Sequence, residues 1–241
     1  MINKIKHFTV LTLISTSILL SGCTETQQDS FFDSAISLAR ESVGFDVKTI
    51  QAEDVNFTYM ERIGSTKNAE TILLLHGFSA NKDNWIRFTK ALDKKYHVLA
   101  VDLAGHGDSE KLLTTDYDLF KQADRLNALM TELGIEQFHI AGNSMGGAIS
   151  AIFSLKHPEK IKSLTLIDAA GIDGKNPSEY YLALAEGKNP LIATDEASFD
   201  FRIDFTMSQP PLLPWPLYSA FLRKTLARAE INEKIFSDML A

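Results

Sequence analysis

The fold of this chain is decided by the stretch Phe138-His139-Ile140-Ala141-Gly142-Asn143-Ser144-Met145-Gly146-Gly147-Ala148. It begins with residues typical of a buried strand, passes through a Gly-x-Ser-x-Gly pattern and continues as a small-residue helix start. Glycines at positions 142 and 146 remove the side chains that would collide in a sharp turn. We therefore predict that Ser144 occupies a strained strand-to-helix turn and presents its hydroxyl above the sheet as a candidate nucleophile.

Strand and helix patterns alternate on both sides of this turn. Short runs rich in Ile, Leu and Val indicate strands buried on both faces, and helical periodicity separates them. The strands are predicted at 71–75, 97–101, 138–141 and 161–167, and the helices at 85–92, 116–133 and 145–156. Two earlier runs, 48–51 and 55–63, alternate as antiparallel strands do. This order predicts an α/β fold with a mostly parallel sheet and flanking helices.

Two further stretches lie at predicted strand ends. One is Leu73-Leu74-Leu75-His76-Gly77-Phe78, in which a buried strand ends in His-Gly before a loop. The other is Val101-Asp102-Leu103-Ala104-Gly105-His106-Gly107-Asp108-Ser109, a strand end followed by a glycine-rich loop. The second stretch has no phosphate-binding pattern, so we expect its role to be structural.

Together these stretches resemble the α/β-hydrolase superfamily, and within it the bacterial lipases often called family V. The resemblance covers about residues 55–241 and includes His76-Gly77-Phe78 with 81–85, the loop 105–109, and 142–147. It implies that Ser144 is the nucleophile and that the backbone N–H groups of Phe78 and Met145 bind the oxyanion. It implies no metal and no organic cofactor. The string Gly-Asn-Ser-Met-Gly-Gly also resembles carbon–carbon bond hydrolases of aromatic catabolism.

The pattern of this superfamily is broken after the serine. Its members order the triad as nucleophile, acid and histidine, but the only histidine after Ser144 is His157. His157 precedes a proline at the far end of the predicted helix, about 18 Å along its axis from the serine. Asp168 follows the strand 161–167 and is either a triad acid or a solvated strand-end residue.

The other histidines do not suit the base role either. His76 and His106 flank glycines in turns and are expected to be structural, while His97 and His139 fall inside strands. We therefore expect the chain to be C-terminally incomplete, without the last strands and the triad acid and base, or else to be a degenerate homologue. As written it should be nearly inactive, because loss of one triad member leaves only about 10³- to 10⁴-fold catalysis over water.

The N-terminus is typical of an exported lipoprotein. Lys4 and Lys6 precede an apolar run over 8–20, which is too short to span a bilayer. The run ends in Leu20-Ser21-Gly22-Cys23, which resembles a lipobox, and Cys23 is the only cysteine. We expect cleavage after residue 22, lipidation of Cys23 and, because Thr24 is not Asp, transfer to the outer membrane. The alternative is an ordinary signal peptide with an incidental cysteine.

The chain divides into four predicted segments. They are a lipoprotein signal peptide (1–22), a polar tether with a leading helix (23–54), the hydrolase core (55–171) and a cap inserted after the sixth strand (172–241). The tether is expected over 24–30 and the leading helix over 31–43. The cap is rich in apolar side chains that either contact an acyl chain or pack the cap on the body; they are Phe199, Phe201, Phe205, Met207, Leu212, Leu213, Trp215 and Leu217.

Composition limits the partners. With 241 residues, 45% of them hydrophobic, the chain can bury the core of one domain. A formal charge of −7 argues against nucleic acid as a partner, because binders of phosphate backbones concentrate Lys and Arg. The expected partners are an ester or lipid substrate and a membrane reached through the lipid anchor.

These observations predict a lipase or carboxylesterase. Export and lipid anchoring favour fatty-acid esters, because products of aromatic catabolism are handled in the cytoplasm. Two alternatives remain: a carbon–carbon bond hydrolase of the same fold, and a lipoprotein that binds apolar ligands without turnover.

Overall fold

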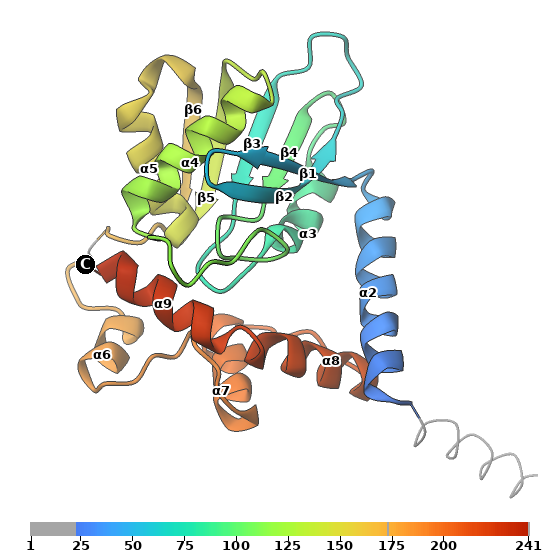
Figure 1. The fold of residues 1–241 in the computed structure, drawn as a ribbon, viewed down its shortest axis with the longest axis vertical. Helices are drawn as coiled ribbons and strands as arrows, with labels where there is room; N and C mark the ends of the chain where they lie inside the picture. Colours follow the sequence, from blue (N-terminus) through green and yellow to red (C-terminus); the bar gives the residue numbers. More distant parts are fainter. Residues whose placement is uncertain (1–22, 173, 241) are drawn as a thin grey trace, which may run out of the picture.

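The computed structural model describes residues 23–172 and 174–240 and is built on a six-stranded sheet (Figure 1). The order across the sheet is β1-β2-β4-β3-β5-β6. The strands are β1 (Asp46–Ala52), β2 (Val55–Arg62), β3 (Thr71–Leu75), β4 (His97–Val101), β5 (Phe138–Asn143) and β6 (Ile161–Ile167). β3 to β6 are parallel, and β1 and β2 are antiparallel additions to one edge. The predicted fold class is confirmed.

Alternate residues of the central strands enter two separate hydrophobic cores. Leu73 and Leu75 of β3 lie in the core beneath the helices of one face, while Leu74 lies in the core of the other face. This division follows from the two-residue period of a strand. All three leucines are fully buried, as expected of a parallel strand covered on both sides.

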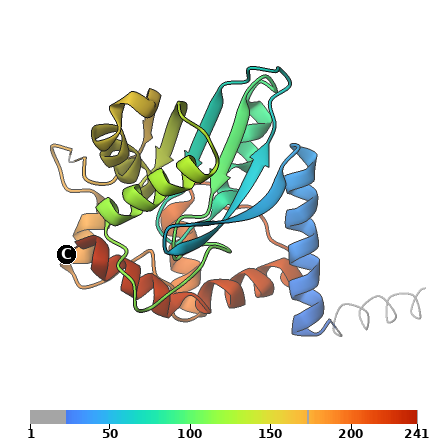
Figure 2. The same cartoon turned by 45° about the horizontal axis from the view of Figure 1, so that its top comes forward.

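The helices around the sheet agree with the sequence patterns. α4 (Leu119–Glu132) and α5 (Met145–Lys156) cover one face (Figure 2), and α3 (Ile86–Ala91) packs on the other. α4 begins three residues later than predicted, because Asp118 caps it by accepting hydrogen bonds from the amides of Phe120 and Lys121. The predicted helix 85–92 corresponds to α3, which follows a 3₁₀ turn, η1 (Lys82–Trp85).

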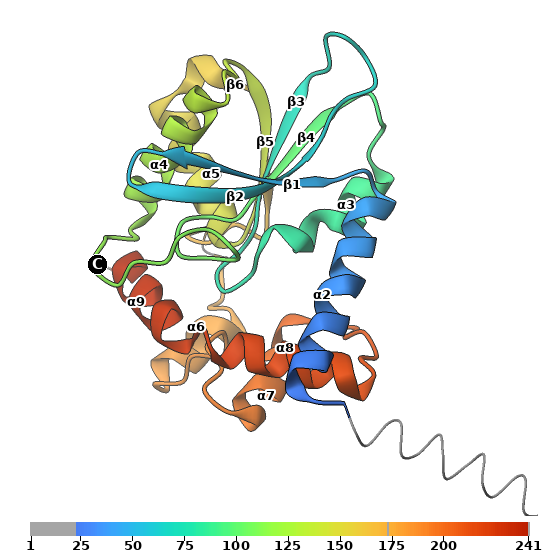
Figure 3. The same ribbon diagram turned by 45° about the vertical axis from the view of Figure 1, so that its right-hand side comes forward.

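The predicted tether over 24–30 is wrong, because α2 (Glu25–Ser42) is already helical there. Thr24 and Gln27 form a capping box in which each side chain accepts from the other residue's backbone amide. The same turns also pack on α8 (Trp215–Leu226), a partner nearly two hundred residues away that the local sequence does not reveal (Figure 3). Only Thr24 therefore separates Cys23 from a helix. The predicted signal peptide and His7 lie outside the described residues.

β6 is not buried on both faces as predicted. Leu164 and Leu166 are each 38% exposed, and β6 pairs only with β5 among the strands of the described chain. The strand follows η2 (Pro158–Lys160). Its apolar sequence matches the other strands, but its position at the edge of the sheet leaves it open to solvent.

Residues beyond β6 form helices that lie past one end of the sheet (Figures 1 and 3). They are α6 (Glu179–Ala185), α7 (Glu196–Thr206), α8 and α9 (Ala229–Leu240). α9 is packed against the body through Ile235, which lies against Gly105 and Tyr117, and through Asp238, which accepts from the Tyr117 amide at 2.9 Å. Within 23–172 and 174–240, no helix combines the length and apolarity needed to span a membrane.

Candidate active site

Ser144 lies between β5 and α5 in a conformation that non-glycine residues rarely adopt. Its φ is 52° and its ψ is −118°, so it is the strained turn that the sequence predicts. Its amide donates to the Ile167 carbonyl at 3.0 Å, and its carbonyl accepts from the Ala170 amide at 3.0 Å. The side chain is half-buried and makes no capping hydrogen bond to α5. The Ser144 hydroxyl is therefore not used to cap α5.

The glycines on both sides of Ser144 are required by close backbone contacts. A Cβ at Gly142 would lie 2.1 Å from the Gly146 carbonyl oxygen, and one at Gly146 would lie 2.4 Å from the Leu75 carbonyl oxygen. Both distances are far inside van der Waals contact with atoms that cannot move away. The turn is thus wedged against the end of β3, which brings the loop after β3 next to the serine.

That loop approaches Ser144 through Gly77. A Cβ on Gly77 would lie 3.2 Å from the Cβ of Ser144, so the two backbones nearly touch. The Gly77 carbonyl accepts from His76 Nδ1 at 2.7 Å and from the Ala80 amide at 3.3 Å. In a trans peptide the C=O and the following N–H point in opposite directions. These two bonds therefore fix the direction of the Phe78 N–H.

The two amides predicted to bind an oxyanion are available. Neither the Phe78 nor the Met145 N–H donates a hydrogen bond to another part of the described chain. Met145 is the first residue of α5, where the amide has no partner within the helix. Both side chains are buried, at 7% and 1% exposure, so the donors lie in a partly desolvated setting. Their assignment as an oxyanion hole stays a prediction.

His76 and His106 form a buried pair under the oxyanion loop. The Leu103 amide donates to His76 Nε2 at 3.1 Å, so the ring proton is on Nδ1, where it binds Gly77. Burial lowers the pKa of His76 to about 4. Burial and the neighbouring His76 lower the pKa of His106 to about 3. Both rings are therefore neutral at pH 7, in agreement with the expected structural role.

A buried ion-pair network, which the sequence did not indicate, joins η1 to the glycine-rich loop 101–109. Lys82 Nζ donates to Asp102 at 2.7 Å and to Asp108 at 2.7 Å, and the Lys82 amide donates to Asp102 at 2.6 Å. Lys82 and Asp102 are 1% and 0% exposed. Burial acts to raise the pKa of Asp108, but the bond from Lys82 outweighs it, and the pKa lies below its ordinary value. The glycine-rich loop 101–109 is thus structural, as expected.

α2 reaches this network from its C-terminal end. The Arg40 guanidinium donates to both carboxylate oxygens of Asp83, at 2.7 Å each. The hydrogen bond to Asp83 raises the pKa of Arg40 against the opposing effect of burial. In sequence Lys82 and Asp83 are two charged residues of a polar run, and only the fold shows that one is buried and the other faces α2.

The structure brings no histidine to Ser144 among the residues it describes. His157 ends α5 and packs on Phe153, with ring centroids 5.1 Å apart. His97 bonds to Glu61 at 2.7 Å, and His139 bonds to Ser163 at 2.8 Å, both along the sheet. Asp168 is exposed, with φ 45°, on the segment whose backbone touches Ser144. Its part in a triad stays a prediction.

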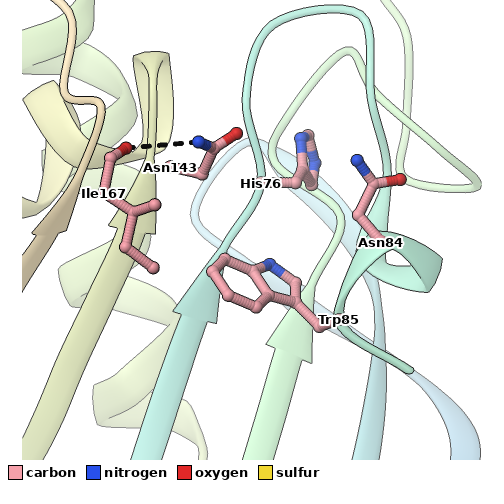
Figure 4. Close-up of a pocket in the computed structure, with 5 residues that line it drawn as sticks. All are labelled: His76, Asn84, Trp85, Asn143 and Ile167. Carbon is pink, nitrogen blue, oxygen red and sulfur yellow. Dashed lines mark hydrogen bonds between the residues drawn. The ribbon is translucent and has the colours of Figure 1, made fainter. Parts of the chain in front are cut away.

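A cavity of about 200 Å³ lies beside the serine turn (Figure 4). It is lined by His76, Asn84, Trp85, Asn143 and Ile167. The Asn143 side chain donates to the Ile167 carbonyl at 3.2 Å. A larger polar hollow, lined by Gln51, Asn56, Asp108 and Glu110, contains none of the predicted catalytic groups. We therefore place the chemistry at Ser144 rather than in the larger hollow.

Fold and site together define the class of this protein. The chain belongs to the alpha/beta hydrolase fold family, whose model matches residues 70–228. It is 33% identical over 229 residues to Lipase 3 of Moraxella sp. (strain TA144), covering 93% of this chain and 72% of the relative. It is 31% identical to Lipase 1 of Psychrobacter immobilis over 229 residues, covering 93% of this chain and 71% of the relative.

A solved structure agrees over nearly the whole chain. The crystal structure of a membrane phospholipase A, described as a bacterial virulence factor, superposes with a TM-score of 0.85 at 36% identity. The match covers 97% of this chain and 74% of that one. At the level of the family, these relatives support ester hydrolysis.

Proposed function

We propose that this protein hydrolyses carboxylic esters of fatty acids, with Ser144 as the nucleophile. The observation that carries the proposal is the backbone of Ser144, held at φ 52° between two glycines that have no room for a side chain. A strained serine at the carboxyl edge of a parallel sheet, facing a loop with an unbonded amide, suits acyl transfer. The lipases among the relatives support the same chemistry.

The reaction is an acyl transfer in two steps. The Ser144 oxygen attacks the ester carbonyl, and the Phe78 and Met145 amides stabilise the negative charge on the carbonyl oxygen. The alcohol leaves with a proton, and water then releases the fatty acid and restores the serine hydroxyl. No histidine of the described chain is hydrogen-bonded to Ser144, so none of them is proposed as the general base.

Ester hydrolysis is tested with nitrophenyl esters of graded chain length and the protein expressed from its whole gene. Ser144→Ala should lower kcat by at least about 10⁴-fold, because the nucleophile is lost. Ser154→Ala is the matched control on the same helix, since this serine bonds only to the Ser150 carbonyl at 2.7 Å. It should retain activity within about twofold. Fluorophosphonate should label the parent and the control but not Ser144→Ala.

Two outcomes would replace this proposal. Preference for a vinylogous diketone over esters would indicate a carbon–carbon bond hydrolase. Absence of fluorophosphonate labelling in the parent would indicate a protein that binds apolar ligands without turnover.

We also propose that Cys23 carries a lipid that holds the protein on the cell envelope, with the outer membrane as the expected location. Cys23 is free and exposed and lies two residues before α2. Growth with an alkyne-tagged fatty acid should label the parent, and Cys23→Ser should lose the label and leave the membrane fraction. A membrane-bound, unlabelled parent would contradict the proposed anchor.

A further inference from the structure

Ser79, the residue after the proposed oxyanion donor Phe78, is held by two cap helices at once. Arg202 Nη2 on α7 donates to the Ser79 carbonyl at 2.9 Å. Asn232 Nδ2 on α9 donates to the Ser79 hydroxyl at 3.0 Å. Two cap residues, each more than a hundred positions from Ser79 along the chain, therefore meet on this one residue of the oxyanion loop.

Both cap side chains are committed to this contact. Asn232 is only 3% exposed, and burying an amide without a partner would be unfavourable. Arg202 forms no ion pair with a carboxylate in the described chain, and its bond to Ser79 is charge-assisted. Burial, and then repulsion from Arg228, lower the pKa of Arg202.

Ser79 itself is strained. Its φ is 56°, in the left-handed region that is unfavourable for a non-glycine residue. Its neighbour Ala80 closes the turn with a long bond of 3.3 Å to the Gly77 carbonyl. This is one of the two bonds that fix the Phe78 N–H. If Ser79 relaxed to negative φ, the turn would open and the Phe78 amide could rotate away from Ser144.

We propose that Arg202 and Asn232 are positioning residues, which hold Ser79 in its left-handed conformation and thereby aim the Phe78 amide at the oxyanion. The cap is then a working part of the catalytic site: the oxyanion hole is complete only when α7 and α9 are docked on the loop. This inference rests on the proposed ester hydrolysis at Ser144 and adds two residues that act through the loop without touching the substrate.

The test uses the protein from the whole gene and nitrophenyl acetate, an ester too short to depend on contacts of an acyl chain with the cap. Arg202→Met and Asn232→Leu should each lower kcat about 10-fold and change KM by less than about twofold. The expected fall in kcat is smaller than the roughly 10²- to 10³-fold loss on removing an oxyanion donor, because the Phe78 amide would be misaligned and not removed. Arg202→Lys should recover part of the loss. Arg223→Met, an arginine of α8 that bonds to α2, is the matched control and should leave kcat unchanged.

A second readout separates positioning from simple support of the fold. The affinity of a boronic acid, which mimics the tetrahedral intermediate, should fall by the same factor as kcat/KM, while the thermal midpoint stays near that of the parent. Ser79→Gly should make Arg202→Met less harmful, since glycine adopts positive φ without strain. Ser79→Ala removes the Asn232 acceptor without changing the cap, should Asn232→Leu fail to fold.

Each contrary result overturns the inference. Unchanged kcat in Arg202→Met and Ser79→Ala would show that the cap contacts do not position the loop. A rise in KM alone would show that these residues bind substrate, and losses that follow only the thermal midpoint would show a purely structural role. An inactive, unlabelled parent would refute the proposed ester hydrolysis instead.

Discussion

The body around Ser144 and the cap are built in different ways. In the body, Gly142 and Gly146 beside the serine have no space for a Cβ, and Lys82 and Asp102 form a fully buried ion pair. In the cap, Leu212 is 96% exposed and Phe201 52% exposed, and α6 has no buried residue. The local geometry of the serine is therefore fixed by many mutually dependent contacts. In the cap, α9 is packed on the body through Ile231 and Ile235, while α6 and the segment around Leu212 remain open to solvent.

The apolar side chains predicted for the cap differ in burial. Phe199 is fully buried and packs on Phe221, with ring centroids 5.2 Å apart, so it serves to hold cap helices together. Phe201, Met207, Leu212 and Trp215 remain exposed and are free to meet an apolar surface or an acyl chain. The predicted set of apolar cap residues thus contains both packing and exposed members.

The largest loss of unfolding free energy is expected when the buried Lys82–Asp102 ion pair of the body is removed. Lys82→Met leaves the Asp102 carboxylate buried without its cation, and this should cost about 3–5 kcal/mol of unfolding free energy. Urea unfolding followed by circular dichroism measures the loss. The matched control is Lys188→Met in the cap, where Lys188 and Glu186 are 70% and 66% exposed. Exposed pairs contribute about 0–1 kcal/mol, so equal losses in both variants would contradict the contrast.

Mild acid should weaken the body selectively. His76 and His106 have folded-state pKa values of about 4 and about 3, below the ordinary value of 6.5. The unfolded chain therefore binds protons that the folded chain excludes, so stability is present above pH 6.5 and falls as pH falls toward the folded pKa values. By pH 5 the loss should be on the order of 2 kcal/mol for each ring.

Urea unfolding at pH 7, 6 and 5 measures this loss. Residues 172–241 contain no histidine, so the cap has no corresponding source of acid sensitivity in this range. His106→Leu should reduce the slope of stability against pH. A slope that is flat in the parent between pH 6.5 and 5 would show that these rings are protonated in the folded state.

The smallest effect is expected where α2 supports the cap. Arg223 donates to Gln28 at 2.8 Å and to Asp29 at 2.6 Å, and both members of the ion pair are partly exposed. Arg223→Met should therefore cost only about 0.5–1 kcal/mol. It should speed limited proteolysis within 172–214 and leave ester turnover intact. Faster cleavage within the body at 97–143 would show that α2 supports the sheet rather than the cap.

The sequence predicted most of the parallel sheet and the serine turn. A Gly-x-Ser-x-Gly pattern between an apolar strand and a small-residue helix start is local information, since each feature depends on residues a few positions apart. The bounds of α5 were predicted without error. The prediction that side chains at positions 142 and 146 would collide in the turn is confirmed. Two predictions were wrong: residues 25–30 belong to α2, which packs on the distant helix α8, and β6 is exposed at the edge of the sheet.

What the sequence determined by itself was the place of the turn at Ser144, because the spacing of Gly142 and Gly146 and the periodicity of the strand before them are local features. The tertiary structure then holds this turn against the end of β3 and against Ile167. Only the tertiary structure decided that Lys82 is buried against Asp102, and that Arg202 and Asn232 meet on Ser79. In the sequence, charged and polar residues at those positions look like ordinary surface residues. Their partners come from distant elements, and the burial that makes each contact matter exists only once the cap and the loops are packed together.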